Sequence, residues 1–267
     1  MTTALDPYRP GDSLLHRLDA RVKVSLTLAY ILTTSLTPVG AWPIIWLLLG
    51  LALAAVILSE MRAGFVLTRT AAALPFVLAA LPLLFTVPGT PLFSLPWGWQ
   101  ATREGLQRVA MMAARMWLSV LMAFTLTATT PFAEILAALR AWGLPKLLVA
   151  VVGLTWRYLF VLVDEAQRLM RARAARSGRA ARSGRAGGGR GGSVAWRARV
   201  TGGMAGNLML RGTERAERIY GAMSARGYDG APRVLAQRPL SGRRRALAAL
   251  GWAALALVAL TGLLVWG

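Results

Sequence analysis

Two arginines at predicted helix ends are the residues of this chain whose type and spacing indicate a binding function. The segment from Glu214 to Gly230 reads ERAERIYGAMSARGYDG. At helical spacing, one face of this segment gathers Ala216, Ile219, Met223 and Arg226. Gly227 then supplies a natural helix stop. An arginine beside such a stop can enter a pocket of another protein, where its guanidinium donates charge-assisted hydrogen bonds to carboxylates or carbonyl oxygens.

The segment has a second copy earlier in the chain. Residues 164–177, DEAQRLMRARAARS, align without a gap with residues 214–227, ERAERIYGAMSARG. The motif Ala175, Arg176 and Ser177 meets Ala225, Arg226 and Gly227, and the expected coupling faces carry Leu169 and Arg173 in the first copy and Ile219 and Met223 in the second. Two arginine-tipped helices predict two docking sites, and therefore a partner present in two copies. The alternative is a pair of basic surface helices that match by chance in a chain rich in alanine and arginine.

Between the two copies the sequence is of low complexity. The string ARSGRA occurs twice in tandem from Ala175, and GGGRGG follows. Glycine at this density argues against a continuous helix, so residues 178–192 are predicted to form a flexible basic linker. The tandem repeat also places Arg182 in the same local string as Arg176. The register of the first copy favours Arg176 as the docking residue, with Arg182 as the alternative.

Composition places these helices in a membrane protein. The chain has 267 residues, of which 56% are hydrophobic, and a mean hydropathy of +0.51. Such a chain is too apolar for an ordinary soluble domain and indicates membrane-spanning helices. Its formal net charge is nevertheless +20, and most basic residues lie between Arg168 and Arg245. Basic blocks in membrane proteins stay on the cytoplasmic side, where they meet anionic lipid, so we expect a multi-pass protein of the plasma (inner) membrane.

The residue types present exclude several kinds of site. Cysteine is absent and His16 is the single histidine, so no transition-metal site can be built from this chain's own Cys and His, and no disulfide or thiol catalysis is available. The sequence also has no Gly-rich phosphate loop followed by Lys and Ser or Thr. We therefore expect no catalytic residue, no bound metal and no cofactor held by this chain.

The apolar stretches predict an all-α integral membrane protein with about five transmembrane helices, or six by hydropathy. The five stretches cover approximately residues 22–36, 42–58, 70–86, 105–127 and 246–266. The expected organisation has three parts: an N-terminal bundle of four spans over residues 1–127, a cytoplasmic domain of amphipathic coupling helices over residues 128–245, and a C-terminal transmembrane helix over residues 246–267.

Residues 145–163 are the stretch that a hydropathy scan would count as a sixth span. If this stretch crossed, the arginine block that follows it would lie outside, against the rule that positive residues stay inside. It also contains Arg157, and Asp164 and Glu165 follow at once. We therefore expect a helix that lies against the cytoplasmic face of the bundle, with the N-terminus and the coupling domain cytoplasmic. A crossing of the membrane by this stretch is the alternative.

Arg115 lies within the predicted fourth span. Ionisable residues at such depth usually face a bundle interior or a partner protein, so a role in coupling or transport fits the sequence. A structural role, in which the side chain snorkels or pairs internally, fits the sequence equally well.

Four strings in the chain resemble a known family. They are LHRLDARVKVSL, LPFVLAALPLLF, TTPFAEILAALRAWGLPKLL and ERIYGAMSARGYDG. They resemble the T component of energy-coupling-factor (ECF) transporters, and the nearest likeness is to the cobalt-type CbiQ family, over about residues 15–230. The most specific part is the paired Ala-Arg-Ser/Gly motif at Arg176 and Arg226. Arg157 with Tyr158 is similar to the family's Arg-Tyr pair, which implies a brace among the cytoplasmic helices.

The resemblance implies a non-catalytic energy-coupling subunit. Such a subunit would transmit ATP-driven motion from two CbiO-like ATPase subunits, which bind the ATP, to a CbiM-like substrate-binding membrane subunit with a CbiN-like chain. Cobalt uptake is the expected function, with nickel or a vitamin-type substrate as alternatives. A rival interpretation is a membrane-anchored binder of polyanions through the Arg/Gly run of residues 178–192. That run lacks interleaved aromatic residues apart from the nearby Trp196, so membrane lipid is an expected partner and nucleic acid is not.

Overall fold

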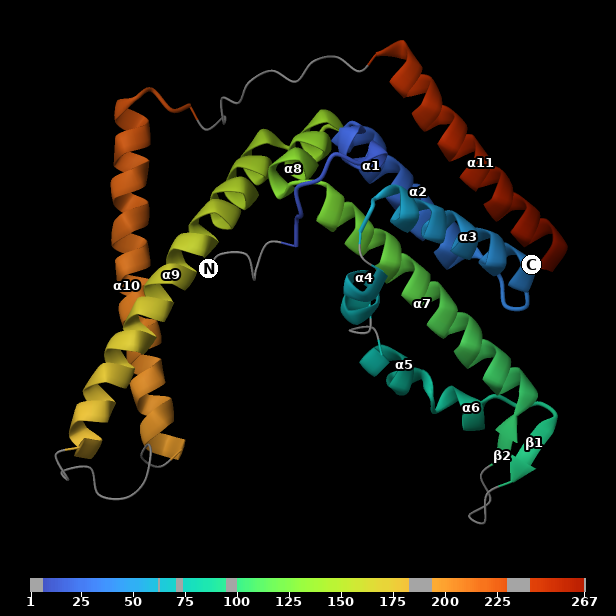
Figure 1. Ribbon diagram of the computed structural model, residues 1–267, viewed down its shortest axis with the longest axis horizontal. Helices are drawn as coiled ribbons and strands as arrows, with labels where there is room; N and C mark the ends of the chain where they lie inside the picture. Colours follow the sequence, from blue (N-terminus) through green and yellow to red (C-terminus); the bar gives the residue numbers. More distant parts are fainter. Residues whose placement is uncertain are drawn as a thin grey trace. The chain divides into compact units, whose positions relative to one another are not determined.

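The computed structural model describes residues 7–61, 63–70, 74–94, 100–182, 194–229 and 241–266 (Figure 1). The chain forms two compact units, one made of residues 3–142 with 237–267 and the other of residues 143–236. Both units are built from α-helices, which confirms the predicted all-α membrane fold. The first unit also carries a short antiparallel hairpin of β1 (Pro91–Ser94) and β2 (Gln100–Thr102).

The first unit contains most of the helices. In chain order they are α1 (Leu14–Arg17), α2 (Ala20–Leu36), α3 (Trp42–Leu58), α4 (Ala63–Thr70), α5 (Leu74–Ala80), α6 (Leu83–Thr86), α7 (Arg103–Thr129), α8 (Phe132–Ala141) and α11 (Gly242–Trp266). The second unit contains α9 (Lys146–Arg182) and α10 (Val194–Ala225). Side-chain caps define two of the starts: Asp19 accepts a hydrogen bond from the amide of Arg21 at α2, and Thr102 accepts from the amide of Gly105 at α7.

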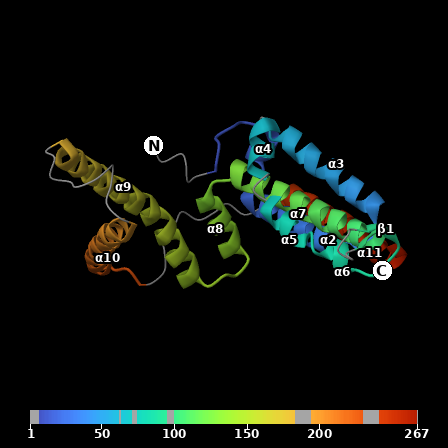
Figure 2. The ribbon, with the colours of Figure 1, turned by 90° about the horizontal axis from the view of Figure 1, so that it is seen from below.

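Helix α2 lies alongside α7 and α11 (Figure 2) and also contacts α8. Three of its side chains donate hydrogen bonds to carbonyl oxygens of other helices. Tyr30 Oη donates to Leu48 O over 2.9 Å, Thr33 Oγ1 to Leu255 O over 3.3 Å, and Lys23 Nζ to Thr129 O over 3.1 Å. Because a bilayer offers no water to these polar groups, hydrogen bonds of this kind join spans at depth.

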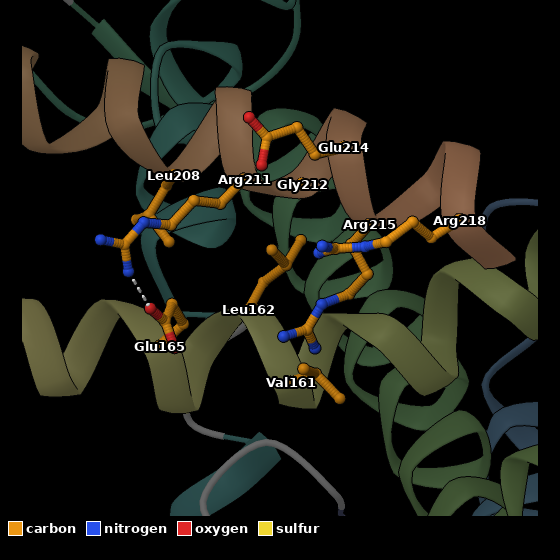
Figure 3. Close-up of a pocket in the computed structure, with 9 residues that line it drawn as sticks. All are labelled: Val161, Leu162, Glu165, Leu208, Arg211, Gly212, Glu214, Arg215 and Arg218. Carbon is orange, nitrogen blue, oxygen red and sulfur yellow. Dashed lines mark hydrogen bonds and ion pairs between the residues drawn. The ribbon is translucent and has the colours of Figure 1, made fainter.

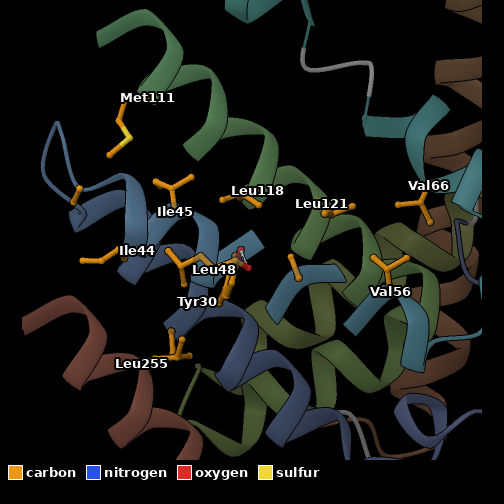
Figure 4. Packing of buried hydrophobic residues seen from close by; sticks show 13 residues of the cluster. Tyr30, Ile44, Ile45, Leu48, Val56, Val66, Met111, Leu118, Leu121 and Leu255 are labelled. Atoms are coloured by element: carbon orange, nitrogen blue, oxygen red, sulfur yellow. Dashed lines mark hydrogen bonds between the residues drawn. The ribbon is translucent and has the colours of Figure 1, made fainter. Parts of the chain in front are cut away.

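An apolar core fills the space between α2, α3, α7 and α11 (Figure 4). Its largest fully buried side chains are Tyr30, Leu48, Met111 and Leu118. Around this core, α3 and α11 leave large apolar side chains exposed, among them Trp46, Leu47, Ile57, Leu250, Leu257, Leu260 and Leu264. An apolar outer surface on an apolar core suits lipid rather than water, so the first unit is a membrane domain.

Among the described residues, three helices are long and apolar enough to cross a membrane, at Arg103–Thr129, Lys146–Ala175 and Arg244–Trp266. The first and last of these agree with predicted spans. Helix α3 and the stretch Val77–Thr86 are apolar but shorter. Length and composition alone would allow α9 to cross, so its predicted place on the cytoplasmic face stays a prediction.

The predicted third span, residues 70–86, is not a single helix. Helix α4 ends at Thr70, and α5 and α6 are separated by a turn at Leu81 and Pro82. Proline has no backbone N–H to continue a helical hydrogen-bond ladder, which explains the break at this point. Residues 71–73 lie outside the described part of the chain.

The structure divides the chain after Trp142, whereas the sequence places the boundary after residue 127. Helix α8 packs against α2 with Leu136 and Ala138 buried, so it belongs to the first unit. Helix α11 belongs there as well, because it packs along α2. The amphipathic pattern that predicted a coupling helix over α8 therefore marks the face that this helix buries on the bundle.

Candidate coupling site

Helices α9 and α10 form an antiparallel pair (Figure 1). Two contacts set their register. Glu165 Oε1 accepts a hydrogen bond from Arg211 Nη1 at 2.6 Å, and Arg173 Nη1 donates to Thr201 Oγ1 at 3.4 Å. Residue numbers therefore rise along α9 as they fall along α10, and the two C-terminal ends point in opposite directions.

Helix α9 runs without interruption to Arg182, so Ala175, Arg176 and Ser177 all lie within it. The predicted linker, residues 178–192, therefore starts later than expected, because its first residues continue α9. Alanine and arginine favour helix strongly enough here to outweigh the single glycine among those residues. The side chains that follow Ala175 in α9, and the rest of the linker, lie outside the described part of the chain. The preference for Arg176 over Arg182 stays a prediction.

The end of α10 has the geometry of a Schellman motif. Gly227 adopts a left-handed conformation with φ +76°, which favours glycine. The amide of Tyr228 donates to Met223 O, and the amide of Gly227 donates to Ser224 O, each over 3.0 Å. The predicted stop at Gly227 is confirmed. Arg226 stands at this cap with an exposed side chain, and this side chain forms no hydrogen bond or ion pair with another described residue, so its guanidinium is available to a partner.

The coupling face of α10 lines an open apolar groove against α9. Ile219 and Met223 lie in this groove, which has a volume of about 400 Å³, together with Leu154 and Tyr158 of α9. Tyr220, which also lines the groove, is 67% exposed. Helix α10 therefore presents apolar side chains that α9 covers only in part, as expected of a surface that meets another protein.

The coupling face of α9 differs, because Arg173 is used inside the pair. Its guanidinium carbon lies 5.7 Å from the ring centre of Trp196, and its Nη1 donates to Thr201. Leu169, one turn earlier, is half-buried. The sequence grouped Arg173 with the docking faces, whereas the structure places it as a brace between α9 and the first turns of α10.

Arginines gather in a second, smaller hollow between the two helices (Figure 3). It is lined from α10 by Arg211, Arg215 and Arg218, and from α9 by Val161, Leu162 and Glu165. Glu165 is the acceptor here, since it pairs with Arg211 and also approaches Arg168 at 3.9 Å. The sequence carries no local signal for the Glu165–Arg211 pair. The two residues are 46 positions apart, and only the packing of the helices brings them together.

The two remaining predicted site residues lie apart from the docking motifs. Arg157 of α9 is exposed, with its guanidinium carbon 5.9 Å from the ring centre of the adjacent Tyr158. It forms no hydrogen bond or ion pair with another described residue, so its bracing role stays a prediction. Arg115 occupies the middle of α7 in the first unit. Its Nε and Nη2 atoms are buried and have no hydrogen-bond partner among the described residues.

The described part of the chain holds no group of three or more His, Asp or Glu side chains that could bind a metal. His16 uses both ring nitrogens locally, Nδ1 with Ser13 Oγ at 2.7 Å and Nε2 with Arg9 O at 3.0 Å. What the α9/α10 pair does offer is a free arginine at a helix end and a half-covered apolar groove. Both features suit recognition of another protein.

Known proteins similar to this chain are transporter subunits. Residues 11–236 match the family described as Cobalt transport protein, CbiQ. The chain is 31% identical over 274 residues to the energy-coupling factor transporter transmembrane protein EcfT of Listeria innocua, which covers 98% of this chain and 97% of that protein. It is 27% identical over 243 residues to the EcfT protein of Brevibacillus brevis, which covers 85% of each. It is 30% identical over 164 residues to the cobalt transport protein CbiQ of Rhodobacter capsulatus, which covers 60% of this chain and 62% of that protein.

The match to the family spans both structural units. It begins before α1, extends beyond the end of α10 and stops before α11, so it includes α1 to α8 of the membrane bundle together with both helices that carry the arginine motifs. The relatives are T components, which are non-catalytic membrane subunits of transporters. The chain therefore belongs to the CbiQ family and is the energy-coupling T component of an ECF transporter.

Proposed function

We propose that this T component transmits ATP-driven motion from two ATPase subunits to a substrate-binding membrane subunit, for uptake of cobalt or nickel ions. The observation that carries the proposal is the placement of the two arginine motifs at opposite ends of the α9/α10 pair. The ATPase subunits would be CbiO-like. The membrane subunit would be CbiM-like, with a CbiN-like chain.

Helix geometry supports two separate sockets. Arg176 stands 11 residues beyond Glu165, and Arg226 stands 15 residues beyond Arg211. At about 1.5 Å per residue these lengths are roughly 16 and 22 Å, and they run in opposite directions from the Glu165–Arg211 contact. The two motifs therefore lie on the order of 40 Å apart. That separation is too large for one pocket and suits one socket on each of two ATPase subunits.

The pair also has the stiffness that a lever needs. Helix α9 carries Arg176 without a break, and the Schellman motif fixes the end of α10 beside Arg226. The Glu165–Arg211 ion pair and the contact of Arg173 with Trp196 cross-link the two helices. A displacement of either socket would then move both helices together rather than bend one of them.

The charges of α10 support a cytoplasmic position for the pair. Helix α10 carries Arg211, Arg215 and Arg218 on the side that meets α9, together with Glu214. If the matching part of α9 crossed the hydrocarbon core, these groups would be drawn into lipid, at a cost of about 2.5–3.5 kcal/mol for each central charge. A place at the cytoplasmic surface of the plasma (inner) membrane avoids that cost.

Metal specificity would belong to the partner membrane subunit. A first-row metal ion prefers several nitrogen or sulfur ligands, and this chain has one histidine and no cysteine. Cobalt is favoured over other substrates because the family and one relative carry cobalt transport in their names. Nickel remains the alternative metal, and a vitamin-type substrate the alternative class.

The proposal is tested by co-purification with the ATPase subunits and by ATP hydrolysis in the reconstituted complex. We expect Arg226→Glu and Arg176→Glu each to weaken ATPase binding by at least about tenfold, because truncation of a buried, paired arginine costs about 2–5 kcal/mol. The double variant should lose the complex. Arg108→Glu, at an exposed arginine of α7 in the first unit, is the matched control and should bind as wild type does.

Unchanged assembly of the folded double variant would contradict the two-socket lever. It would return the repeat to chance similarity and favour the rival polyanion binder. That rival predicts retention of the chain on heparin or on anionic lipid vesicles that falls steeply with salt and that depends on the Arg/Gly run.

A further inference from the structure

The proposed coupling function assigns no role to Arg115, a charged side chain in the middle of α7. The residue as a whole is half-buried, while its Nε and Nη2 atoms are buried without a hydrogen-bond partner among the described residues. A guanidinium that is desolvated without an acceptor is unfavourable, and within a membrane domain it is more so. The arrangement persists only if something outside the described chain supplies the acceptor.

The depth of Arg115 excludes lipid phosphate as that acceptor. Helix α7 runs from Arg103 to Thr129, and Arg115 stands 12 residues from its start and 14 from its end. At about 1.5 Å per residue, the residue lies roughly 18 Å and 21 Å from the two ends. Half of a hydrocarbon core is about 15 Å, so the side chain starts near the bilayer centre and cannot snorkel to either headgroup layer.

The described part of the first unit has no carboxylate at this depth. The acidic residues of the first unit nearest to the spans are Asp19, Glu60, Glu104 and Glu134. Asp19 precedes α2, Glu60 follows α3, Glu104 is in the first turn of α7, and Glu134 is in the first turn of α8. No acidic residue lies between these positions or after Asp229. These four carboxylates therefore lie near helix ends, far from the middle of α7.

One stripe of α7 at the level of Arg115 is open to a neighbour. Met112, Arg115 and Ser119 share a face at helical spacing. Met112 is 47% exposed, and Ser119 is half-buried, so this face is not sealed by the bundle. The exposed part of the Arg115 side chain therefore lies on a face of the membrane domain that a helix of another subunit can approach.

We propose that Arg115 is an intersubunit contact that receives an Asp or Glu carboxylate from a transmembrane helix of the substrate-binding membrane subunit. The inference rests on the proposed function, which supplies that subunit. An arginine–carboxylate contact in lipid has no water to compete with it, and it would give the guanidinium an acceptor once the partner helix packs on this face. Arg115 thereby fixes where the partner subunit meets the bundle, separately from the ATPase sockets.

The test uses the full transporter complex in lipid nanodiscs, with each subunit quantified after affinity purification through this chain. Arg115→Gln keeps much of the volume but removes the charge, and we expect it to lower retention of the membrane subunit by at least about tenfold. Arg115→Lys should restore part of that retention. The ATPase subunits should stay bound in both variants. Arg108→Gln, at an exposed arginine two turns earlier in α7, is the matched control.

The two proposals fail in different ways in this experiment. Arg226→Glu should release the ATPase subunits and keep the membrane subunit, whereas Arg115→Gln should do the reverse. Replacing the acidic residues in the partner's spans one at a time by Asn or Gln should reproduce the Arg115→Gln loss at one position. The charge swap of that residue with Arg115 should restore retention. Wild-type retention in Arg115→Gln would overturn the contact, as would loss of both partners together.

A crosslinking measurement covers the case in which Arg115 variants fold poorly. Because the chain has no cysteine, Ser119→Cys introduces a single thiol one turn from Arg115 without touching the arginine. A benzophenone maleimide at this thiol should crosslink to the membrane subunit on illumination. Thr261→Cys, on the exposed face of α11, controls for random collisions in the membrane. Crosslinks from Ser119→Cys that stay within this chain would show Arg115 to be an internal brace and would overturn the proposal.

Discussion

The membrane bundle around α2 and the α9/α10 pair place their polar groups in opposite ways. In the bundle, Tyr30, Thr33 and Lys23 direct their hydrogen bonds inward to carbonyl oxygens of neighbouring helices, and apolar side chains face outward. In the pair, opposite charges join the two helices across their contact, while Arg226 and an apolar groove stay uncovered.

The difference follows from the surroundings of each region. Lipid cannot satisfy a polar group, so the bundle satisfies its own, and lipid covers its apolar surface without cost. At the cytoplasmic surface that we propose for the pair, water would satisfy the exposed arginine but not the apolar groove, so the proposed function has a partner protein cover that groove. The bundle is organised around internal hydrogen bonds, whereas the proposed function gives the pair contacts with its partners.

The largest loss of stability is expected at Tyr30, whose side chain is almost wholly buried in the bundle. We expect Tyr30→Ala to lower the free energy of unfolding by about 3–5 kcal/mol, through the cavity and the lost bond to Leu48 O. Tyr30→Phe removes only the hydroxyl and should cost about 0.5–1.5 kcal/mol. The measurement is unfolding of the purified protein by SDS in mixed micelles. Equal costs for the two variants would show that the hydrogen bond, not packing, dominates there.

A substitution at Gly227 tests the end of α10, whose stability depends on backbone conformation rather than on burial of a side chain. Alanine at φ +76° should cost about 1–2 kcal/mol, because a Cβ is crowded in the left-handed region. We expect Gly227→Ala to fray the last turn and to weaken ATPase binding through Arg226, while Gly227→Asn is better tolerated. Hydrogen exchange at the Tyr228 amide measures the fraying. Gly221→Ala, inside the same helix with open space around it, is the control and should instead stabilise α10.

The smallest expected effect is at the ion pair between the two helices. The Arg211 side chain is 59% exposed, so the ion pair with Glu165 should contribute only about 0.2–1 kcal/mol to the free energy of unfolding. A double-mutant cycle of Glu165→Gln and Arg211→Gln measures this coupling energy. Raising the salt concentration should reduce that coupling energy. Glu214→Gln serves as the control, since Glu214 forms no ion pair with another described residue. A coupling energy above this range would mean that the pair is desolvated in the assembled transporter.

Local signals in the sequence predicted several elements closely. The stretch of residues 42–58 is α3, and Gly227 ends its helix as its neighbours indicate. The prediction failed where neighbours in space mattered more than neighbours in sequence. Residues 70–86 are apolar enough for a span but are interrupted at Pro82, and α8, beyond the predicted boundary at residue 127, packs with the first unit.

In the candidate site, too, local sequence predicted some features, and contacts between helices determined the others. The repeat marked both arginine motifs, but the helix stop that accompanies the motif is present only at Gly227, because α9 continues past Ser177 to Arg182. The sequence placed Arg173 on a docking face, but the structure turns it onto Trp196. No periodicity could have shown this, since the partner belongs to another helix.

By itself, the sequence determined that this protein is helical and lies in a membrane, and its motifs identified the family. Hydropathy, periodicity and turn chemistry each depend on residues within a few helical turns of one another. Only the tertiary structure decided that Lys23 donates to Thr129, 106 residues away, that Glu165 meets Arg211, and that Nε and Nη2 of Arg115 have no acceptor among the described residues. These outcomes depend on how whole helices pack. A hydrogen bond forms only when donor and acceptor lie within about 3 Å of each other, and the order of residues in the chain does not fix that distance between two helices.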